Sequence, residues 1–201
     1  MVNNSTLIIG ANGSMGKRYS AIFKHIGEYF YGIDKDYGFE KMLGILHRFN
    51  HVIIATPTES HIDFLRAIIP LKKNILCEKP ITKKTSEFNE IKNLLLENPT
   101  SKLAMTMQYS ELIKDPFSNG ISKYDYYNTG KDGLYWDCLQ IIALSKGIVE
   151  INNISPIWQC HLNGEKLSLS DMDYAYVSFI KNWLNGNIHH EINFLTEIHK
   201  K

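Results

Sequence analysis

The sequence predicts an α/β fold, in which a doubly wound parallel sheet is followed by a reduced α+β region. Short apolar runs and stretches with helical spacing alternate five times between residues 7 and 109. Parallel sheets with crossover helices produce this alternation. Past residue 109 the alternation stops, and Asn163-Gly164 gives a strong hairpin signal between two strand-like runs. We therefore divide the chain into residues 1–110 and residues 111–201.

The first part is expected to contain five strands and four helices. A fully apolar strand, such as the one at 51–55, is typical of a sheet covered on both faces, and helix 86–97 carries apolar residues on one face. Its N-cap is expected among the residues Thr82 to Thr85. The expected strands are 7–9, 29–33, 51–55, 74–77 and 102–109, and the expected helices are 17–26, 37–49, 60–69 and 86–97.

The second part is expected to be shorter and mixed. Ser170-Asp171 can cap a long helix over 172–184. The other expected elements are strands at 121–128, 148–154 and 157–162, a helix at 132–145 and a short helix at 187–201.

Composition narrows the classes of function. The chain has 201 residues, 22 basic and 21 acidic side chains and a net charge of +1, so no basic excess favours nucleic acid. No apolar run is long enough to cross a bilayer, and the polar N-terminus does not resemble a signal peptide. The three cysteines show no paired spacing, so we expect reduced thiols and a cytoplasmic protein. We expect no binding to membrane or nucleic acid. We also expect no metal, because the sequence has no cluster of ligands and the adjacent His189 and His190 would point apart on a helix.

A glycine motif follows the first strand. Residues 10–16 read Gly-Ala-Asn-Gly-Ser-Met-Gly, a G-x-x-G-x-x-G spacing and not G-x-G-x-x-G. The strand before it, the helix after it and Asp34, eighteen residues past Gly16, supply the context of a dinucleotide-binding Rossmann domain. Glycines let the backbone approach a pyrophosphate, and the helix N-terminus attracts its charge. The residues expected to bind the cofactor here are Gly10, Asn12, Gly13, Ser14, Met15 and Gly16.

Asp34 ends the second expected strand. A carboxylate there can accept hydrogen bonds from ribose hydroxyls and repels a 2′-phosphate. NAD is therefore the expected cofactor. NADP stays possible, because Lys17 or Lys35 could neutralise a phosphate.

Two further motifs follow the next strands, Thr56-Pro57 with His61 and then Glu78-Lys79-Pro80. With them, residues 5–110 resemble the Gfo/Idh/MocA family of nicotinamide-dependent sugar and polyol oxidoreductases. The resemblance implies that Lys79 binds the reacting hydroxyl or carbonyl and handles its proton. It also implies that the cofactor is lined by Thr56, Pro57, Glu78 and Pro80. His61 is expected to pack at a helix start or touch the cofactor edge, and not to act as an acid–base.

The chain departs from this family in its second part. Family members carry an aspartate and a histidine on a helix, and the comparable run here is 136–147. Asp137 matches the leading acid, but the histidine position falls on Gln140 or Ile141. The later aspartate is replaced by alanine or leucine. The usual general acid–base would then be missing.

These observations predict an NAD(P)-dependent oxidoreductase that transfers hydride between nicotinamide and a sugar, nucleotide-sugar or polyol carbon. Lys79 and Asp137 are the expected catalytic residues, and Lys79, Tyr109 and Gln140 the expected substrate contacts. The alternative is a non-catalytic cofactor-binding relative that acts as a sensor or partner subunit. Because the second domain is small, we also expect a homodimer or a higher homo-oligomer.

Overall fold

The computed structural model describes residues 5–112, 124–127, 159–162 and 165–188. The chain forms two compact units. Met1–Thr106 and Ile180–Asn193 make the first, and Met107–Phe179 and Phe194–Lys201 make the second. The predicted functional boundary after residue 110 stays a prediction.

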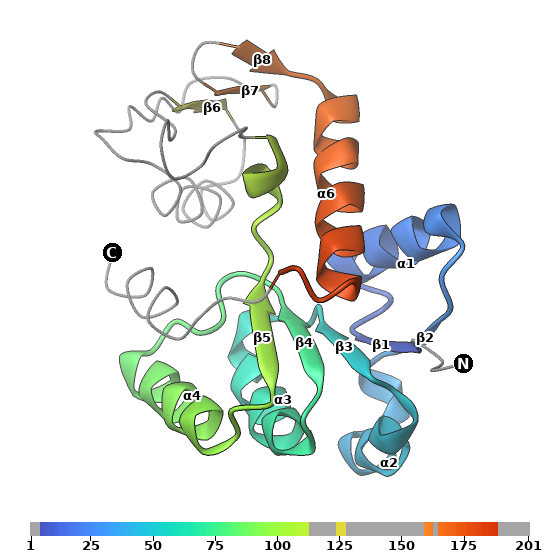
Figure 1. Ribbon diagram of the computed structural model, residues 1–201, viewed down its shortest axis with the longest axis vertical. Coiled ribbons are helices and arrows are strands. Elements are labelled where there is room, and N and C mark those ends of the chain that lie inside the picture. Colours follow the sequence, from blue (N-terminus) through green and yellow to red (C-terminus); the bar gives the residue numbers. More distant parts are fainter. Residues whose placement is uncertain (1–4, 113–123, 128–158, 163–164, 189–201) are drawn as a thin grey trace. The chain divides into compact units, whose positions relative to one another are not determined.

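The first unit is built on a five-stranded sheet in the order β2-β1-β3-β4-β5, in which every neighbouring pair is parallel (Figure 1). From β1 the chain moves one way to β2 and then returns past β1 to β3, so the sheet is doubly wound, as predicted. The strands are β1 (Thr6–Ile9), β2 (Phe30–Ile33), β3 (His51–Ile54), β4 (Asn74–Cys77) and β5 (Lys102–Met105).

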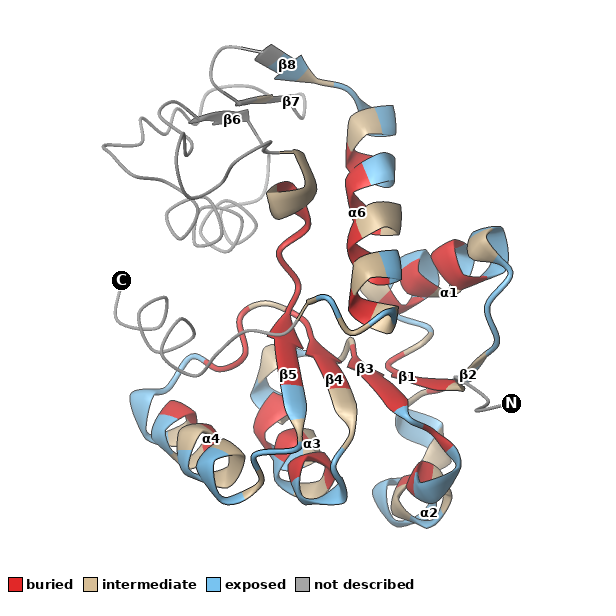
Figure 2. Cartoon of the chain, viewed as in Figure 1, coloured by how far each residue is buried: buried red, intermediate tan, exposed pale blue. Residues whose placement is uncertain are grey.

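Helices cover both faces of this sheet. Because right-handed crossovers that run in opposite directions place their helices on opposite faces, α1 lies on one face and α2, α3 and α4 on the other (Figure 1). Every residue of β1 and β3 is buried, whereas the helices are buried only in part (Figure 2). The helices are α1 (Ser14–Ile26), α2 (Phe39–Ile45), α3 (His61–Ile68) and α4 (Thr85–Glu97).

Several predicted element ends were wrong. Helix α1 begins three residues before residue 17, directly after Gly13. The expected helix 37–49 is three pieces, because Gly38, at φ +83°, separates the 3-10 turn Lys35–Tyr37 from α2, and a second 3-10 turn follows at Leu46–Arg48. Strand β5 ends at Met105, and residues 108–112 form a 3-10 turn.

The N-cap of α4 lies within the predicted range 82–85, but it is not a threonine. The capping position is held by Lys84, which makes no side-chain capping bond. The Thr82 hydroxyl instead donates to the Glu87 carboxylate at 2.5 Å and accepts from the Lys84 amide at 3.1 Å. Thr82 therefore ties the loop before α4 to its first turn from outside the helix.

The second unit contains an antiparallel sheet of β6 (Tyr124–Tyr127), β7 (Gln159–Leu162) and β8 (Glu165–Leu167). The hairpin predicted at 163–164 is confirmed by the pairing of β7 with β8. The elements expected at 132–145 and 148–154, and most of 187–201, lie outside the described residues.

The last described helix, α6 (Leu169–Leu184), begins three residues before its predicted start. Its cap is Ser168 and not Ser170. The Ser168 hydroxyl accepts from the Asp171 amide at 3.2 Å, and the Asp171 carboxylate accepts from the Ser168 amide at 2.7 Å. The last turn of α6 belongs to the first unit, where Trp183 is buried and packs edge-on against His51. Within the described ranges, no helix is both long and apolar enough to span a bilayer.

Candidate functional site

The predicted motifs meet at the carboxyl edge of the parallel sheet. The Gly10 amide donates to the Ile33 carbonyl, the Ala55 amide to the Ile9 carbonyl and the Glu78 amide to the Ile54 carbonyl, each at 2.9 Å. These bonds lie just past the strand ends. The loops that follow β1 to β4 therefore leave the sheet side by side, where open α/β folds bind their ligands.

The glycine loop packs too tightly for larger residues. Gly10 has φ +86°, and a Cβ there would lie 2.6 Å from the Ala55 carbonyl oxygen. A Cβ on Gly16 would lie 2.1 Å from the Gly10 carbonyl oxygen. These contacts require glycine at both positions.

The same loop leaves the start of α1 open to an anion. Gly13 is the N-cap, makes no side-chain capping bond, and is followed by a first turn without an acidic side chain. The unpaired amides and the positive end of the helix dipole therefore face no carboxylate of their own helix. The arrangement suits a pyrophosphate, and the cofactor role of residues 10–16 stays a prediction.

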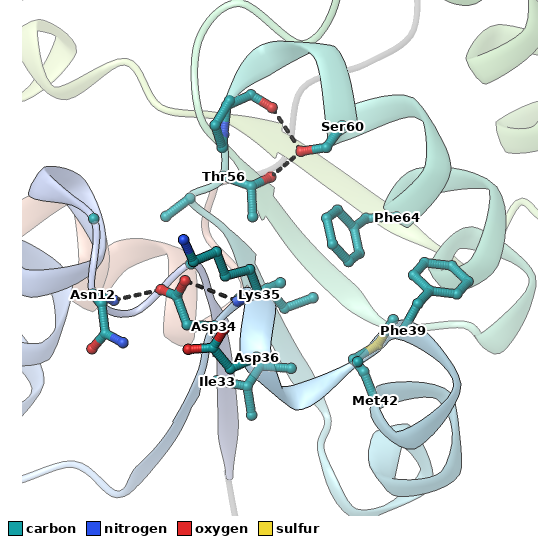
Figure 3. Close-up of a pocket in the computed structure, with 16 residues that line it drawn as sticks. Asn12, Ile33, Asp34, Lys35, Asp36, Phe39, Met42, Thr56, Ser60 and Phe64 are labelled. Atoms are coloured by element: carbon teal, nitrogen blue, oxygen red, sulfur yellow. Dashed lines mark hydrogen bonds between the residues drawn. The ribbon is translucent and has the colours of Figure 1, made fainter.

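Asp34 is held beside the glycine loop by backbone donors. Its carboxylate accepts from the Asn12 amide at 2.9 Å and from the Lys35 amide at 2.8 Å (Figure 3). The Asn12 bond first, and the Lys35 bond second, lower the pKa of Asp34 below its ordinary value. Each carboxylate oxygen can accept another hydrogen bond. An ionised and oriented Asp34 is thus suited to bind ribose hydroxyls.

A cavity of about 690 Å³ opens beside Asp34. Phe39 and Phe64 form an apolar wall, with ring centroids 5.6 Å apart and tilted by 44°, and Met42 lies beside them (Figure 3). Such a wall suits the flat face of a purine. Sequence reasoning did not name Phe39, Met42 or Phe64 as site residues, although aromatic side chains after β2 and β3 were the available signal.

The cavity includes about half of the predicted cofactor residues. Among its lining residues are Gly10, Asn12, Gly13, Asp34, Thr56 and Pro57. It does not include Ser14, Met15, Gly16, His61, Glu78, Lys79 or Pro80. The Ser60 hydroxyl lies 2.8 Å from Thr56 Oγ1 and 2.7 Å from the Pro57 carbonyl oxygen, which fixes this turn.

The Glu78 side chain is held in place by Tyr19, which also contacts Thr106. Sequence reasoning did not identify Tyr19 or Thr106. Glu78 is buried, and the Tyr19 hydroxyl of α1 donates to its Oε1. The same hydroxyl lies 2.9 Å from Thr106 Oγ1. The Lys79 amide donates to Glu78 Oε2 at 3.2 Å. Glu78 therefore connects α1, which carries the glycine loop, to the backbone of Lys79.

His61 joins two of the predicted motifs. It is buried, with Nδ1 3.0 Å from the Pro80 carbonyl oxygen and Nε2 2.9 Å from the Thr56 carbonyl oxygen. The expected packing at a helix start is thus observed, since His61 is the first residue of α3. Its contact with the cofactor edge stays a prediction.

The remaining predicted residues fall in three places. Lys79 is half-buried and follows Glu78 through a chain that turns at a cis Lys79-Pro80 bond. Tyr109 is buried and belongs to the second unit. Asp137 and Gln140 lie outside the described residues. Neighbouring Cys77 is fully buried, and burial raises the pKa of its thiol, so it is no nucleophile.

A metal site has no support in the part of the chain that the structure describes, where His, Cys, Asp and Glu form no group of three suited to an ion.

Two of three comparisons with known proteins find a match, and these two agree on the kind of domain. Residues 29–105 match the family model GFO_IDH_MocA, described as an oxidoreductase family with an NAD-binding Rossmann fold. A search of curated proteins finds no match.

Solved structures show the same fold. The UDP-N-acetylglucosamine 3-dehydrogenase GnnA from Acidithiobacillus ferrooxidans aligns with a TM-score of 0.74 at 13% identity, covering 98% of this chain and 95% of that one. The WlbA (WbpB) dehydrogenase from Thermus thermophilus, in complex with NAD and UDP-GlcNAcA, aligns at 0.68 and 12%, covering 98% and 92%. Myo-inositol 2-dehydrogenase from Lactobacillus plantarum aligns at 0.68 and 10%, covering 98% and 94%.

At these identities the structures establish the fold, and the family model establishes the kind of cofactor domain. The glycine loop, Asp34 and the Glu78-Lys79-Pro80 turn all lie at the carboxyl edge of the sheet. Residues 29–105 are thus similar to the Gfo/Idh/MocA oxidoreductase family, whose Rossmann domain is described as NAD-binding.

Proposed function

We propose that the protein transfers hydride between NAD and the carbon of a hydroxyl group in a sugar, nucleotide sugar or polyol. The observation that carries this proposal is the meeting of three elements at one sheet edge. These are an anion-accepting glycine loop, an ionised carboxylate at Asp34 and a half-buried lysine at residue 79.

The proposed cofactor rests on how well the residues at the carboxyl edge match the parts of NAD. The amides at the start of α1 would hold the pyrophosphate, Asp34 would accept from the adenosine ribose, and Phe39 and Phe64 would cover the purine. Asp34 and Asp36 both line the cavity. Two carboxylates there favour NAD over NADP, because a 2′-phosphate would be repelled. Lys35 also lines the cavity and reduces this preference.

Lys79 is the residue proposed to handle the proton. When bound, NAD supplies the nicotinamide carbon that accepts the hydride, which is the substrate hydrogen together with both electrons of its C–H bond. The proton of the reacting hydroxyl passes to the Lys79 amine, and from there to solvent. The Glu78 anchor fixes the backbone from which that amine extends, which makes positioning a part of the mechanism. Asp137, Tyr109 and Gln140 stay proposed as residues that assist this step or contact the substrate.

The substrate class is inferred from two sources. The first is the family resemblance at Glu78-Lys79-Pro80, and the second is that the structural relatives are named as dehydrogenases of a nucleotide sugar or of inositol. We further propose that the chain assembles into a homodimer or a higher homo-oligomer, which sedimentation of the purified protein would measure.

The test uses the full chain, NAD(H) and a panel of sugars, nucleotide sugars and polyols. With a substrate in hand, Lys79→Ala is expected to lower kcat by at least about a hundredfold, as loss of a general acid–base does, while the Kd for NAD barely changes. Lys83→Ala removes an exposed lysine four residues away and is the matched control. Turnover that survives Lys79→Ala unchanged would contradict the assignment.

A non-catalytic, cofactor-binding relative is the second candidate, favoured by the missing histidine in the run 136–147. Asp34→Ala separates the two. If NAD binding alone is the function, Asp34→Ala removes biological activity and Lys79→Ala leaves it intact. An enzyme loses activity in both variants.

A further inference from the structure

A second cavity, of about 360 Å³, lies at the amino edge of the same sheet. It forms where β3, β4 and β5 begin, next to the residues that follow α6. The Asn74 amide donates to the Asn50 carbonyl at 3.0 Å, and the Lys102 amide to the Lys73 carbonyl at 3.1 Å, so these strand starts are held in register. The cavity is therefore at the opposite end of the strands from the cofactor site, within the same unit.

Its charge is positive and uncompensated. Lys72, Lys73 and Lys102 line it, and none of the lining residues is acidic. No ion pair joins any of the three to a residue in the described ranges. By contrast, Lys83 and Lys84 pair with carboxylates at 2.9 and 2.8 Å. The whole chain has a net charge of only +1. Three lysines around one cavity without an acid therefore make this region more positive than the chain as a whole.

Two residues that line the cavity each carry a buried polar atom without a partner. Asn74 donates through Nδ2 to the Trp183 carbonyl at 3.2 Å, but its Oδ1 is buried and makes no hydrogen bond. His51 is buried and its Nδ1 likewise has no partner. Buried polar atoms normally have partners. Asn74 Oδ1 is an acceptor, so its missing partner is a donor such as a hydroxyl.

The two requirements point to one kind of ligand. The charge of the lysines is complementary to a compact anion with several acceptor oxygens. The unpaired acceptor of Asn74 is complementary to a hydroxyl group. Burial also lowers the pKa of Lys73, because removal from water disfavours its charged form. A bound anion beside Lys73 would stabilise that charged form. The volume is at the lower end of the range for small-molecule sites, which suits one phosphate on a short carbon chain or ring.

We propose that this cavity binds a small phosphomonoester that carries free hydroxyl groups, with Lys72, Lys73 and Lys102 around the phosphate and Asn74 Oδ1 accepting from a hydroxyl. The site is separate from the cofactor crevice and does not rest on the proposed function.

Gly186 contributes space to this site. A Cβ at residue 186 would lie 3.6 Å from Lys102 Nζ, and the φ of +75° favours glycine there. The Lys102 ammonium therefore lies over the turn that ends α6. This position allows a second explanation, in which the lysines only compensate the negative end of the α6 dipole. The experiment must separate the two.

The test measures binding of ribose 5-phosphate, inorganic phosphate and ribose to the full chain by calorimetry, with NMR of backbone amides to locate the site. We expect ribose 5-phosphate to bind most tightly, phosphate more weakly and ribose hardly at all. The shifted amides should be those of Lys73, Asn74, Lys102 and Gly186, and not those of the glycine loop.

The site variant is K72Q/K73Q/K102Q, and the matched control is K24Q/K41Q/K92Q, which removes the same net charge elsewhere in the first unit. The site variant should weaken ribose 5-phosphate at least about tenfold, equivalent to about 1.4 kcal/mol, and the control by less than about twofold. Should the triple variant not fold, K72Q/K102Q changes only the two exposed lysines and should still weaken binding severalfold.

Two results would overturn the proposal. One is the absence of binding to the wild-type protein at millimolar ligand, and a lower Tm of the site variant would then assign the lysines to the α6 dipole. The other is binding that shifts only the glycine-loop amides and is equal in both variants.

Discussion

The two edges of the five-stranded sheet differ in how they present positive charge. At the carboxyl edge the positive potential comes from backbone amides at the start of α1, and the side chains nearest the cavity include the carboxylates Asp34 and Asp36. At the amino edge the positive charge comes from lysine side chains, and no carboxylate lines the cavity.

The difference follows from backbone polarity. A helix that begins at an edge directs amides towards it, so phosphates can be bound without cations and carboxylates are free to select hydroxyls. A helix that ends at an edge, as α6 does beside His51, directs carbonyl oxygens towards it. An anion site there needs charged side chains. The following predictions test the two edges separately, from the largest expected effect to the smallest.

The largest effect is expected at Gly16. In Gly16→Ala, the new Cβ would overlap the Gly10 carbonyl, 2.1 Å away, and the Ala11 Cα, 2.7 Å away. Because both are backbone atoms, the loop must move. We expect NAD binding to be lost and Tm to fall, as measured by calorimetry and thermal unfolding.

Substitutions at two other glycines, Gly13 and Gly44, provide comparisons of decreasing steric overlap. A Cβ on Gly13 would approach the Gly10 oxygen only to 3.3 Å, so Gly13→Ala should weaken NAD binding less. Gly44, inside α2, has nothing within 4 Å. Gly44→Ala should leave binding intact and stabilise the fold by up to about 1 kcal/mol, the difference in helix propensity. Equal binding by the Gly13 and Gly16 variants would contradict the tight-loop geometry.

A smaller effect is expected beneath the carboxyl edge, at Tyr19→Phe. The change removes the hydroxyl that donates to Glu78 and leaves a buried carboxyl oxygen without that donor. Unfolding free energy should fall by about 1–3 kcal/mol, the usual cost of an unsatisfied buried group. Denaturant unfolding measures it. Tyr29→Phe, at a residue that is 67% exposed, is the control and should be neutral.

The smallest effect is a pH dependence at the amino edge. Burial lowers the pKa of His51 below its ordinary 6.5, opposed by a hydrogen bond to the Leu184 carbonyl. As pH falls below 6.5, the unfolded chain takes up a proton that folded His51 resists, so stability falls until the folded pKa is reached. The slope is at most about 1.4 kcal/mol per pH unit.

His51→Asn should remove this contribution. The variant loses the contact with Trp183 and will be less stable at every pH, so the informative quantity is the slope of unfolding free energy between neutral and acidic pH. That slope should flatten in His51→Asn and persist in His47→Asn, which changes an exposed histidine. A slope that is the same in wild type and His51→Asn would show that burial of His51 is not its source.

Much of the first unit could be predicted from sequence, because local signals determine it. Apolar runs predicted all five strands, and the glycine spacing with Asp34 identified the carboxyl edge. Element ends were less predictable. Gly38 broke the expected helix 37–49, and Ser168, four residues before the expected start, capped α6 through Asp171.

What sequence could not supply were contacts between distant segments. Tyr19 and Glu78 are 59 residues apart, and Tyr19 is an ordinary apolar position in the helical pattern of α1. Phe39 and Phe64 lie on different helices and form one wall only after the sheet brings those helices together. The lysine cavity joins residues 72–73 to 102 and 186, and no linear pattern marks it. Such sites depend on strand register and on the return of α6 to the first unit.

The most direct test of the central claim is a crystal structure of the protein grown with NAD. Our account predicts that the adenosine ribose donates to the Asp34 carboxylate, that the purine lies against Phe39 and Phe64, and that the Lys79 amine faces the reactive carbon of the nicotinamide. A dinucleotide bound with its nicotinamide away from Lys79, or bound without contact to Asp34, would contradict it.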